Sequence, residues 1–244
     1  MKNKHLFIVL GVLLIVLLLV ILLIIKTTKL SKIEKIKIED TSSDIMLFYE
    51  EIDNKEVNDT DGYIAYALEY SYNVNDKSEL TTKEIKELIE SKFNIKLEED
   101  KINDVGITPY LLKKNISHDP SEKKYSIDKS ILTQQDISEI PITKYEITNI
   151  KKKGKKYIVT YDKYVVKNPY EIMNYYSDLN VQSEEEETTY DTSEILNYLT
   201  CKGKITSVKK ILTKDDLETL AKKEKSIEIK YILVDGNLKI DNSK

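Results

Sequence analysis

The chain has 244 residues, a formal net charge of −4 and a charged fraction of 33%, and 41% of its residues are hydrophobic. Apolar positions recur along the whole chain, which is typical of a globular protein and not of a disordered tail. The sequence contains no arginine, so it lacks the side chain that binds phosphate and guanine with two parallel hydrogen bonds. Together with the negative charge, this absence predicts that nucleic acid is not a partner.

Residues 6–25 are a nearly unbroken apolar run without any charged or polar side chain. A helix of about 20 residues is roughly 30 Å long, which matches the hydrocarbon core of a bilayer. We therefore predict a transmembrane helix at 6–25, which follows a short tail at 1–5 and contacts the lipid bilayer. The run ends in Ile24-Ile25-Lys26 without the small residues of a cleavage site, so the helix is expected to stay as a single-pass signal anchor.

Two features of the sequence give opposite predictions for the orientation of this anchor, namely the lysine count and the layout of the chain. Five lysines at positions 26–37 follow the helix, whereas only Lys2 and Lys4 precede it, and this count favours a cytoplasmic carboxyl side. The layout of the chain predicts the opposite orientation. A signal anchor whose domain lies outside the cell typically has a short tail, one apolar helix and then a long polar domain. Because long domains translocate largely regardless of charge, we expect the domain to be extracytoplasmic.

The segment after the anchor divides into a linker and a first structured unit. Residues 26–60 are expected to form a stalk and linker with a short helix near its end. Residues 61–135 are expected to form a small helical unit with a hairpin. Asp61 is interpreted as the cap of a helix that ends near Tyr72. Further signals are a capping box at Thr81-Glu84, a helical start at Thr108-Pro109 and a hairpin around Asp119-Pro120-Ser121.

Residues 141–242 are expected to form an α+β domain with an antiparallel sheet. Strand-like runs at 144–150 and 156–166 are joined by a lysine-rich turn that contains Gly154. Helices are expected after Asn168-Pro169, from Asp191, and from a capping box at Thr213-Asp216. The residues 226–240 contain Asp235-Gly236, which is the signature of a two-residue hairpin turn. Strand pairs with helices between them favour the α+β class.

Motifs for catalysis and cofactor binding are missing from the sequence. The glycines are too far apart for a dinucleotide loop or a P-loop. Ser117-His118-Asp119 is not expected to act as a triad, because adjacent side chains point apart. Cys201 has only His118 as a candidate base and is interpreted as a helix-end residue. We therefore predict no catalytic residues, no cofactor and no zinc site.

Three other sequence features have a simple structural interpretation. Asp59-Thr60-Asp61-Gly62 resembles part of a calcium loop, but the first and last ligand positions are apolar, so no metal site is predicted. The tyrosines Tyr63, Tyr66 and Tyr70 share one helix face and are expected to pack rather than to bind sugars. The lysines at 151–156 are expected to protect a sheet edge, with contact to anionic lipid or wall polymer as the alternative.

The layout of Met1-Lys2-Asn3-Lys4, an apolar anchor and a lysine-rich, arginine-free domain resembles the uncharacterised single-pass membrane-anchored proteins of AT-rich Gram-positive-type bacteria. The order of elements after residue 141 is loosely similar to cystatin or NTF2-like domains, which often serve as binding modules. These resemblances imply a membrane-anchored, non-enzymatic, extracytoplasmic binding module, with an envelope polymer or another envelope protein as its partner. The alternatives are a cell-envelope hydrolase that uses paired carboxylates and a cytoplasm-facing membrane-tethered regulator.

Overall fold

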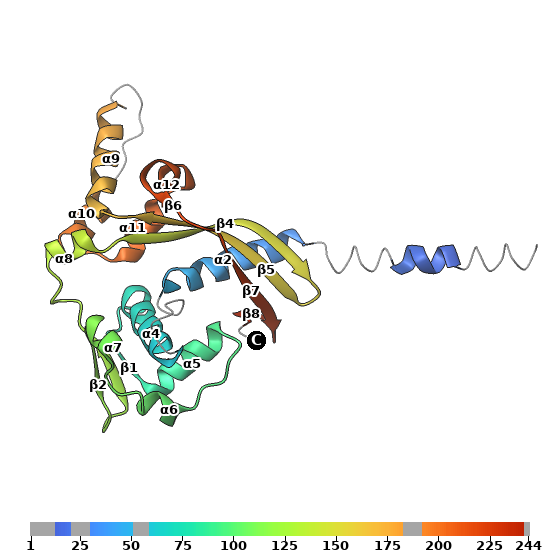
Figure 1. The fold of residues 1–244 in the computed structure, drawn as a ribbon, viewed down its shortest axis with the longest axis horizontal. Coiled ribbons are helices and arrows are strands. Elements are labelled where there is room, and N and C mark those ends of the chain that lie inside the picture. Colours follow the sequence, from blue (N-terminus) through green and yellow to red (C-terminus); the bar gives the residue numbers. More distant parts are fainter. Residues whose placement is uncertain (1–12, 21–29, 51–58, 183–191, 242–244) are drawn as a thin grey trace, which may run out of the picture.

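The computed structural model describes residues 13–20, 30–50, 59–182 and 192–241. These residues form an α+β protein, as the sequence predicts, and its strands are arranged in two antiparallel sheets (Figure 1). The helices from the amino end to the second sheet are α2 (Lys32–Met46), α4 (Asp59–Asn75), α5 (Thr82–Lys92), α6 (Glu99–Asn103), α7 (Pro109–Lys113) and α8 (Gln134–Glu139). The later helices are α9 (Pro169–Gln182), α10 (Ser193–Leu199), α11 (Ile205–Ile211) and α12 (Lys214–Leu220).

The predicted transmembrane segment is only partly described. Residues 13–20 are helical, and their side chains are 47–64% exposed. The rest of 6–25 and the tail 1–5 lie outside the described residues. Within the described ranges, no helix is both long and apolar enough to cross a bilayer.

The smaller sheet belongs to the first predicted unit. Its strands β1 (Glu79–Thr81), β2 (Ile116–Asp119) and β3 (Lys124–Ile127) are arranged in the order β1-β3-β2. The capping box at the start of α5 and the proline at the first position of α7 are both present, as predicted. Asp61 differs from the prediction because α4 already begins at Asp59, so Asp61 lies in the first helical turn and is buried.

The larger sheet follows a different path. Strands β4 (Ile142–Lys153), β5 (Lys156–Val166), β7 (Ile227–Val234) and β8 (Asn237–Ile240) are neighbours in that order, and β6 (Lys222–Lys223) pairs with β5. The predicted turn between β7 and β8 is confirmed, because Asp235 and Gly236 have φ of 49° and 80°. β4 and β5 form a ribbon whose register shifts between Ile147 and Asn149.

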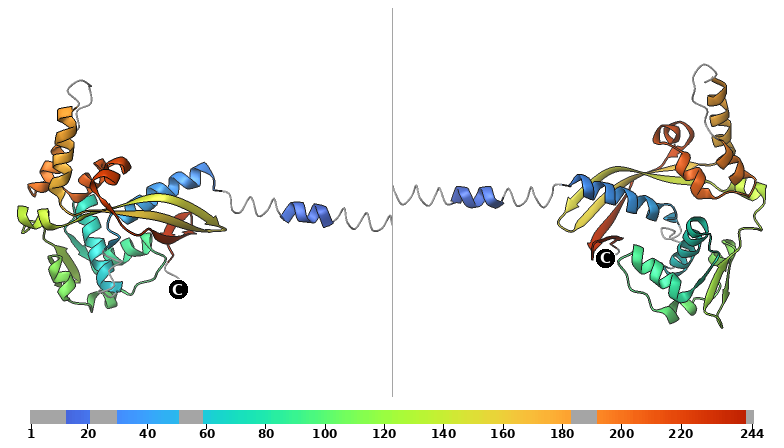
Figure 2. Two further views of the ribbon diagram at one scale, coloured as in Figure 1. Left: turned by 45° about the horizontal axis from the view of Figure 1, so that its top comes forward. Right: turned by 180° about the vertical axis from the view of Figure 1, so that it is seen from behind.

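Helix α2 differs from the stalk that the sequence predicts for this region. A capping box at Ser31 starts the helix, and Ile38, Ile45 and Met46 are buried. Viewed from behind, α2 lies along the large sheet (Figure 2). Its buried residues belong to the same core as Tyr157 and Tyr231 of the sheet. This part of the predicted stalk is therefore built into the globular body.

Two hydrophobic cores lie along the β4–β5 ribbon. The first combines α2, α4, α5, the small sheet and the inner residues of β5, β7 and β8. The second combines α8 to α12 with Ile142 of β4 and Tyr164 and Val166 of β5. The first core thus contains residues of both predicted units, 61–135 and 141–242, and the division into these units stays a prediction. The acidic run from Ser183 and the predicted cap Asp191 lie outside the described residues.

Candidate functional site

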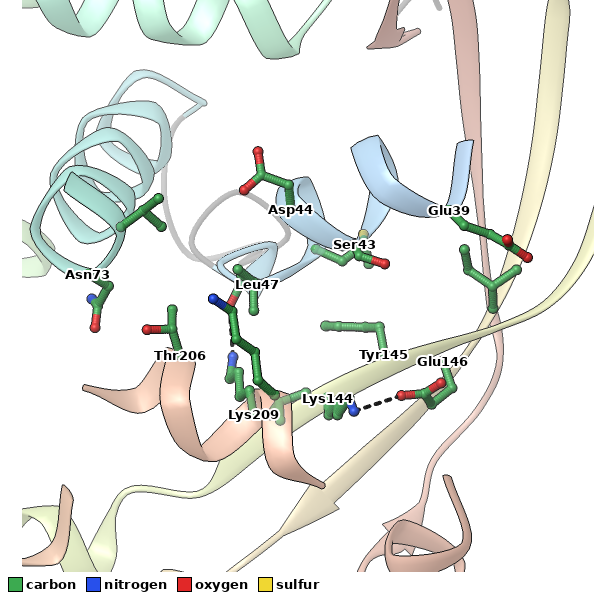
Figure 3. A pocket seen from close by; sticks show the side chains of 15 residues that line it. Glu39, Ser43, Asp44, Leu47, Asn73, Lys144, Tyr145, Glu146, Thr206 and Lys209 are labelled. Carbon is green, nitrogen blue, oxygen red and sulfur yellow. Dashed lines mark hydrogen bonds and ion pairs between the residues drawn. The ribbon is translucent and has the colours of Figure 1, made fainter. Parts of the chain in front are cut away.

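The larger of two neighbouring cavities has a volume of about 600 Å³. It lies where the carboxyl ends of α2 and α4 meet the first half of β4 and helix α11 (Figure 3). The two helices α2 and α4 are far in the sequence from β4 and α11, so the cavity is a product of the tertiary fold. Its labelled polar residues include Asp44, Glu146, Lys144 and Lys209.

Asp44 is the carboxylate that α2 contributes. It accepts a hydrogen bond of 3.0 Å from the Tyr70 hydroxyl and forms an ion pair with Lys92. The Lys92 ammonium lies 4.9 Å from the centre of the Tyr70 ring. Burial raises the pKa of Tyr70, so its hydroxyl stays protonated and able to donate. The Asp44 charge is therefore neutralised within the fold.

The first half of β4 contributes a second ion pair. Lys144 and Glu146 are two positions apart and therefore lie on the same face of the strand, and their charged atoms are 3.0 Å apart. The Lys144 ammonium also donates to the carbonyl of Leu212. Both side chains are 21–25% exposed, so they line the cavity and still contact solvent. This carboxylate, like Asp44, is paired with a lysine.

Lys209 connects α11 to the end of α2. Its ammonium donates to the Leu47 carbonyl at 2.7 Å and lies 5.8 Å from the centre of the Phe48 ring. A cation at the carboxyl end of a helix is favourable, because the helix dipole is negative there. The residue is only 8% exposed, so this charge is a fixed part of the cavity wall.

A second cavity of about 380 Å³ adjoins the first and shares Leu47, Asn73, Thr143 and Lys209 with it. In this cavity Glu69 is buried and lies 2.5 Å from the Lys129 ammonium. The Glu50 Oε1 atom is buried and has no hydrogen-bond partner among the described residues. Five lysines and two glutamates line this cavity, so its wall is cationic although Lys204 is paired with Asp76. The charged residues of the wall are Glu50, Glu69, Lys113, Lys114, Lys129, Lys204 and Lys209.

The residues of the rejected triad have separate partners. The His118 ring is stacked on Tyr125 with 4.1 Å between ring centres, and its Nε2 lies 3.0 Å from Asn103 Oδ1. Burial lowers the pKa of His118. Asp119 accepts hydrogen bonds from Ser121 instead. The three side chains therefore do not form a proton relay.

Cys201 lies at the end of α10 with a φ of 61° and is exposed. It contributes to the wall of the second cavity, whereas His118 does not, so the structure does not bring the thiol and this base together there. The tyrosines Tyr63, Tyr66 and Tyr70 are at most 9% exposed, which confirms that they pack in the core. Within the described ranges, no group of three or more histidine, cysteine, aspartate or glutamate side chains is placed to hold a metal ion.

Apart from Cys201, the sequence did not single out the residues that line these cavities as functional candidates. Asp44, Lys144 and Lys209 are ordinary charged residues at amphipathic positions, and only the tertiary fold brings them together. No family model, curated protein or solved structure matches this chain.

Proposed function

We propose that this chain is a single-pass, membrane-anchored binding module that is not an enzyme. In this proposal residues 6–25 anchor the chain in the bilayer and the α+β body is extracytoplasmic. The ligand is an anionic component of the cell envelope, such as a polymer that carries phosphates or carboxylates. The observation that carries the proposal is the second cavity, whose wall is formed by an excess of lysines over glutamates.

The charges in the larger cavity also favour binding over hydrolysis. A hydrolase with two carboxylates needs one of them protonated as the general acid. In this cavity Asp44 is paired with Lys92, and Glu146 is paired with Lys144. Each of these carboxylates is thus already engaged by a lysine of the protein itself. Neutralised walls of this kind are suited to positioning a ligand.

The resemblance to cystatin and NTF2-like domains rests on the order of elements after residue 141, and helix α2 comes before them. The helix lies along the sheet formed by β4, β5, β7 and β8, and its apolar side joins the core of that sheet. The four helices α9 to α12, which come between β5 and β7, depart from that plan. The binding role is consequently argued from the cavities and not from the resemblance.

Binding is tested with the full chain in detergent micelles and two probes, polyphosphate and polyglutamate, by titration calorimetry at several salt concentrations. We expect at least one probe to bind and the affinity to fall with salt. Lys113→Glu and Lys114→Glu change the cavity wall and should weaken binding about tenfold or more. Lys222→Glu makes the same charge change on exposed β6 and should have little effect. Failure of both probes to bind, or an equal loss in all three variants, would refute the proposal.

The orientation is tested in intact, wall-stripped cells with an impermeant maleimide. The natural thiol is removed by Cys201→Ser, and a new thiol is introduced at the exposed position of Lys222 by Lys222→Cys. The label should react before the membrane is permeabilised. Reaction only after permeabilisation would instead support the cytoplasm-facing regulator.

A further inference from the structure

The turn between β4 and β5 carries the densest positive charge of the described chain. Five of the six residues at 151–156 are lysines, and none is acidic. Lys152 is paired with Glu34 and Lys156 with Asp241, each at 2.7 Å. Lys151, Lys153 and Lys155 are exposed and make no ion pair among the described residues.

This turn lies beside the amino end of α2, as both views in Figure 2 show. Glu34, in the first turn of α2, accepts hydrogen bonds from Lys152 at 2.7 Å and from the Tyr157 hydroxyl at 2.9 Å. The Lys152 ammonium and then the Ser31 amide lower the pKa of Glu34 to about 2. The start of α2 is therefore firmly attached to the lysine turn.

The start of α2 also exposes apolar side chains. Ile33 is 80% exposed and Ile36 is 48% exposed. Residues three apart in a helix lie on the same side, and the buried Ile38 lies on the opposite side. Lys32 and Lys35 flank these two isoleucines and are exposed. A helical turn with exposed isoleucines between lysines is typical of a helix that lies in a membrane interface.

The sequence places this surface close to the predicted anchor. Only the six residues 26–31 separate the apolar run from α2, and six residues span at most about 21 Å even when fully extended. The lysine turn and the start of α2 are thus held within a short distance of the bilayer if residues 6–25 cross it. Lys26 and Lys29 add further positive charge in that interval.

We infer that Lys32, Ile33 and Ile36 of α2 and the turn lysines Lys151, Lys153 and Lys155 form a second membrane contact, which docks the body onto anionic phospholipid headgroups. This inference rests on the proposed anchor at 6–25. The isoleucines enter the boundary between headgroups and acyl chains, and the lysines contact the lipid phosphates.

The acidic residues near this surface define its limit. Glu39 and Asp40 lie on α2 about 10 Å further from the anchor than Lys32, given a rise of about 1.5 Å per residue. Asp235 lies in the neighbouring turn between β7 and β8 and reduces the positive charge there. The contact is therefore confined to the lysine turn and to the first two turns of α2.

The sequence contains no tryptophan, so a single introduced tryptophan is an unambiguous fluorescent probe. The full chain is reconstituted into phosphatidylglycerol vesicles that contain lipids brominated near the headgroup, which quench tryptophan on contact. The probes are Ile33→Trp and Lys153→Trp. The control is Tyr170→Trp in α9, which is 40% exposed and lies at the other end of the ribbon. Circular dichroism verifies that each variant is folded, and flotation verifies that it is bound to vesicles.

We expect both probes to be quenched at least twofold more than Tyr170→Trp. Adding Lys151→Gln and Lys155→Gln, or using phosphatidylcholine vesicles, should reduce the quenching of Lys153→Trp towards the control level. Vesicle-bound chain without preferential quenching would overturn the docking surface and leave the anchor standing. Quenching that is equal in neutral vesicles would overturn the role of anionic lipid. Chain that does not float with the vesicles would overturn the anchor itself.

Discussion

Two buried tyrosines of the first core, Tyr66 and Tyr231, allow the contribution of a buried hydroxyl to stability to be tested by the same change to phenylalanine. Tyr66 and Tyr231 are both 0% exposed. The Tyr231 hydroxyl lies 2.7 Å from the Tyr161 hydroxyl, whereas the Tyr66 hydroxyl has no hydrogen-bond partner among the described residues. Burial raises the pKa of both phenols well above the ordinary value, so both hydroxyls are neutral when the protein is folded. The two side chains differ in whether the hydroxyl is bonded.

The change to phenylalanine should therefore have opposite effects on the free energy of unfolding. A buried hydroxyl without a hydrogen bond costs about 1–3 kcal/mol in proteins, so Tyr66→Phe should stabilise the fold by about 1 kcal/mol. The aromatic contacts of this ring with Phe93, at 5.3 Å between centres, are kept. Tyr231→Phe should destabilise the fold by about 1 kcal/mol, because it removes the buried hydrogen bond between the Tyr161 and Tyr231 hydroxyls.

The measurement is urea unfolding of the full chain in detergent micelles, followed by far-ultraviolet circular dichroism. The slope of free energy against urea should be the same in both variants, since neither changes the surface that unfolding exposes. A loss of stability in Tyr66→Phe as large as that in Tyr231→Phe would refute the reasoning. Such a loss would mean that the Tyr66 hydroxyl is bonded, for example to a buried water.

Three further predictions concern the ion pairs and the amino end of the body. Glu34→Gln should be less stable than the natural chain at neutral pH, because the folded pKa of Glu34 is lowered and its charged form stabilises the fold. The difference in the free energy of unfolding should shrink as the pH falls from about 4.5 towards about 2, where Glu34 becomes protonated, and urea titrations across this pH range measure it. Lys129→Ala should cost about 3 kcal/mol by urea unfolding, because it leaves the buried Glu69 carboxylate without its counter-ion and with only the Asn73 amide as a partner among the described residues. Lys83→Ala removes an exposed ion pair and should cost about 0.5 kcal/mol or less. A fragment that begins at Leu30 should be soluble and unfold cooperatively in calorimetry, whereas one that begins at Asp44 should not, because it lacks most of α2.

The sequence predicted best those elements whose signals are local. The capping boxes at Thr81 and Thr213 and the Asp235-Gly236 turn each specify geometry within a few residues, and all three are present. The long strands β4 and β5 were also predicted: β5 has the expected limits, whereas β4 extends beyond them at both ends. Local signals succeed because nothing distant has to be known to interpret them.

Helix α2 was missed although the capping box at Ser31-Glu34 marks its start locally, and its place in the core is determined by distant contacts. Ile36 and Ile38 alternate with charged residues, which is a strand-like pattern, and Thr41-Ser42-Ser43 interrupts any helical period. The segment is held in the core by the large sheet, whose residues come more than 100 positions later in the sequence. The hydrogen bond from the Tyr157 hydroxyl to Glu34 is one such contact. The cavities could not be predicted for the same reason, since they form between elements that are distant in the sequence.

The contact between α2 and the last hairpin has a consequence for the order in which the protein folds. The Lys37 ammonium donates to the Gly236 carbonyl, which is 199 positions away in the sequence. Strand β8 also contacts the segment just after α5, through a hydrogen bond of 2.7 Å from the Asn94 amide to the Ile240 carbonyl. During synthesis, the apolar faces of α2 and α5 are made first, and the core that contains them closes only once β7 and β8 have been made. A nascent chain that stops short of β7 and β8 consequently exposes these faces, so loss of the carboxyl-terminal hairpin is expected to be as damaging as loss of α2 itself.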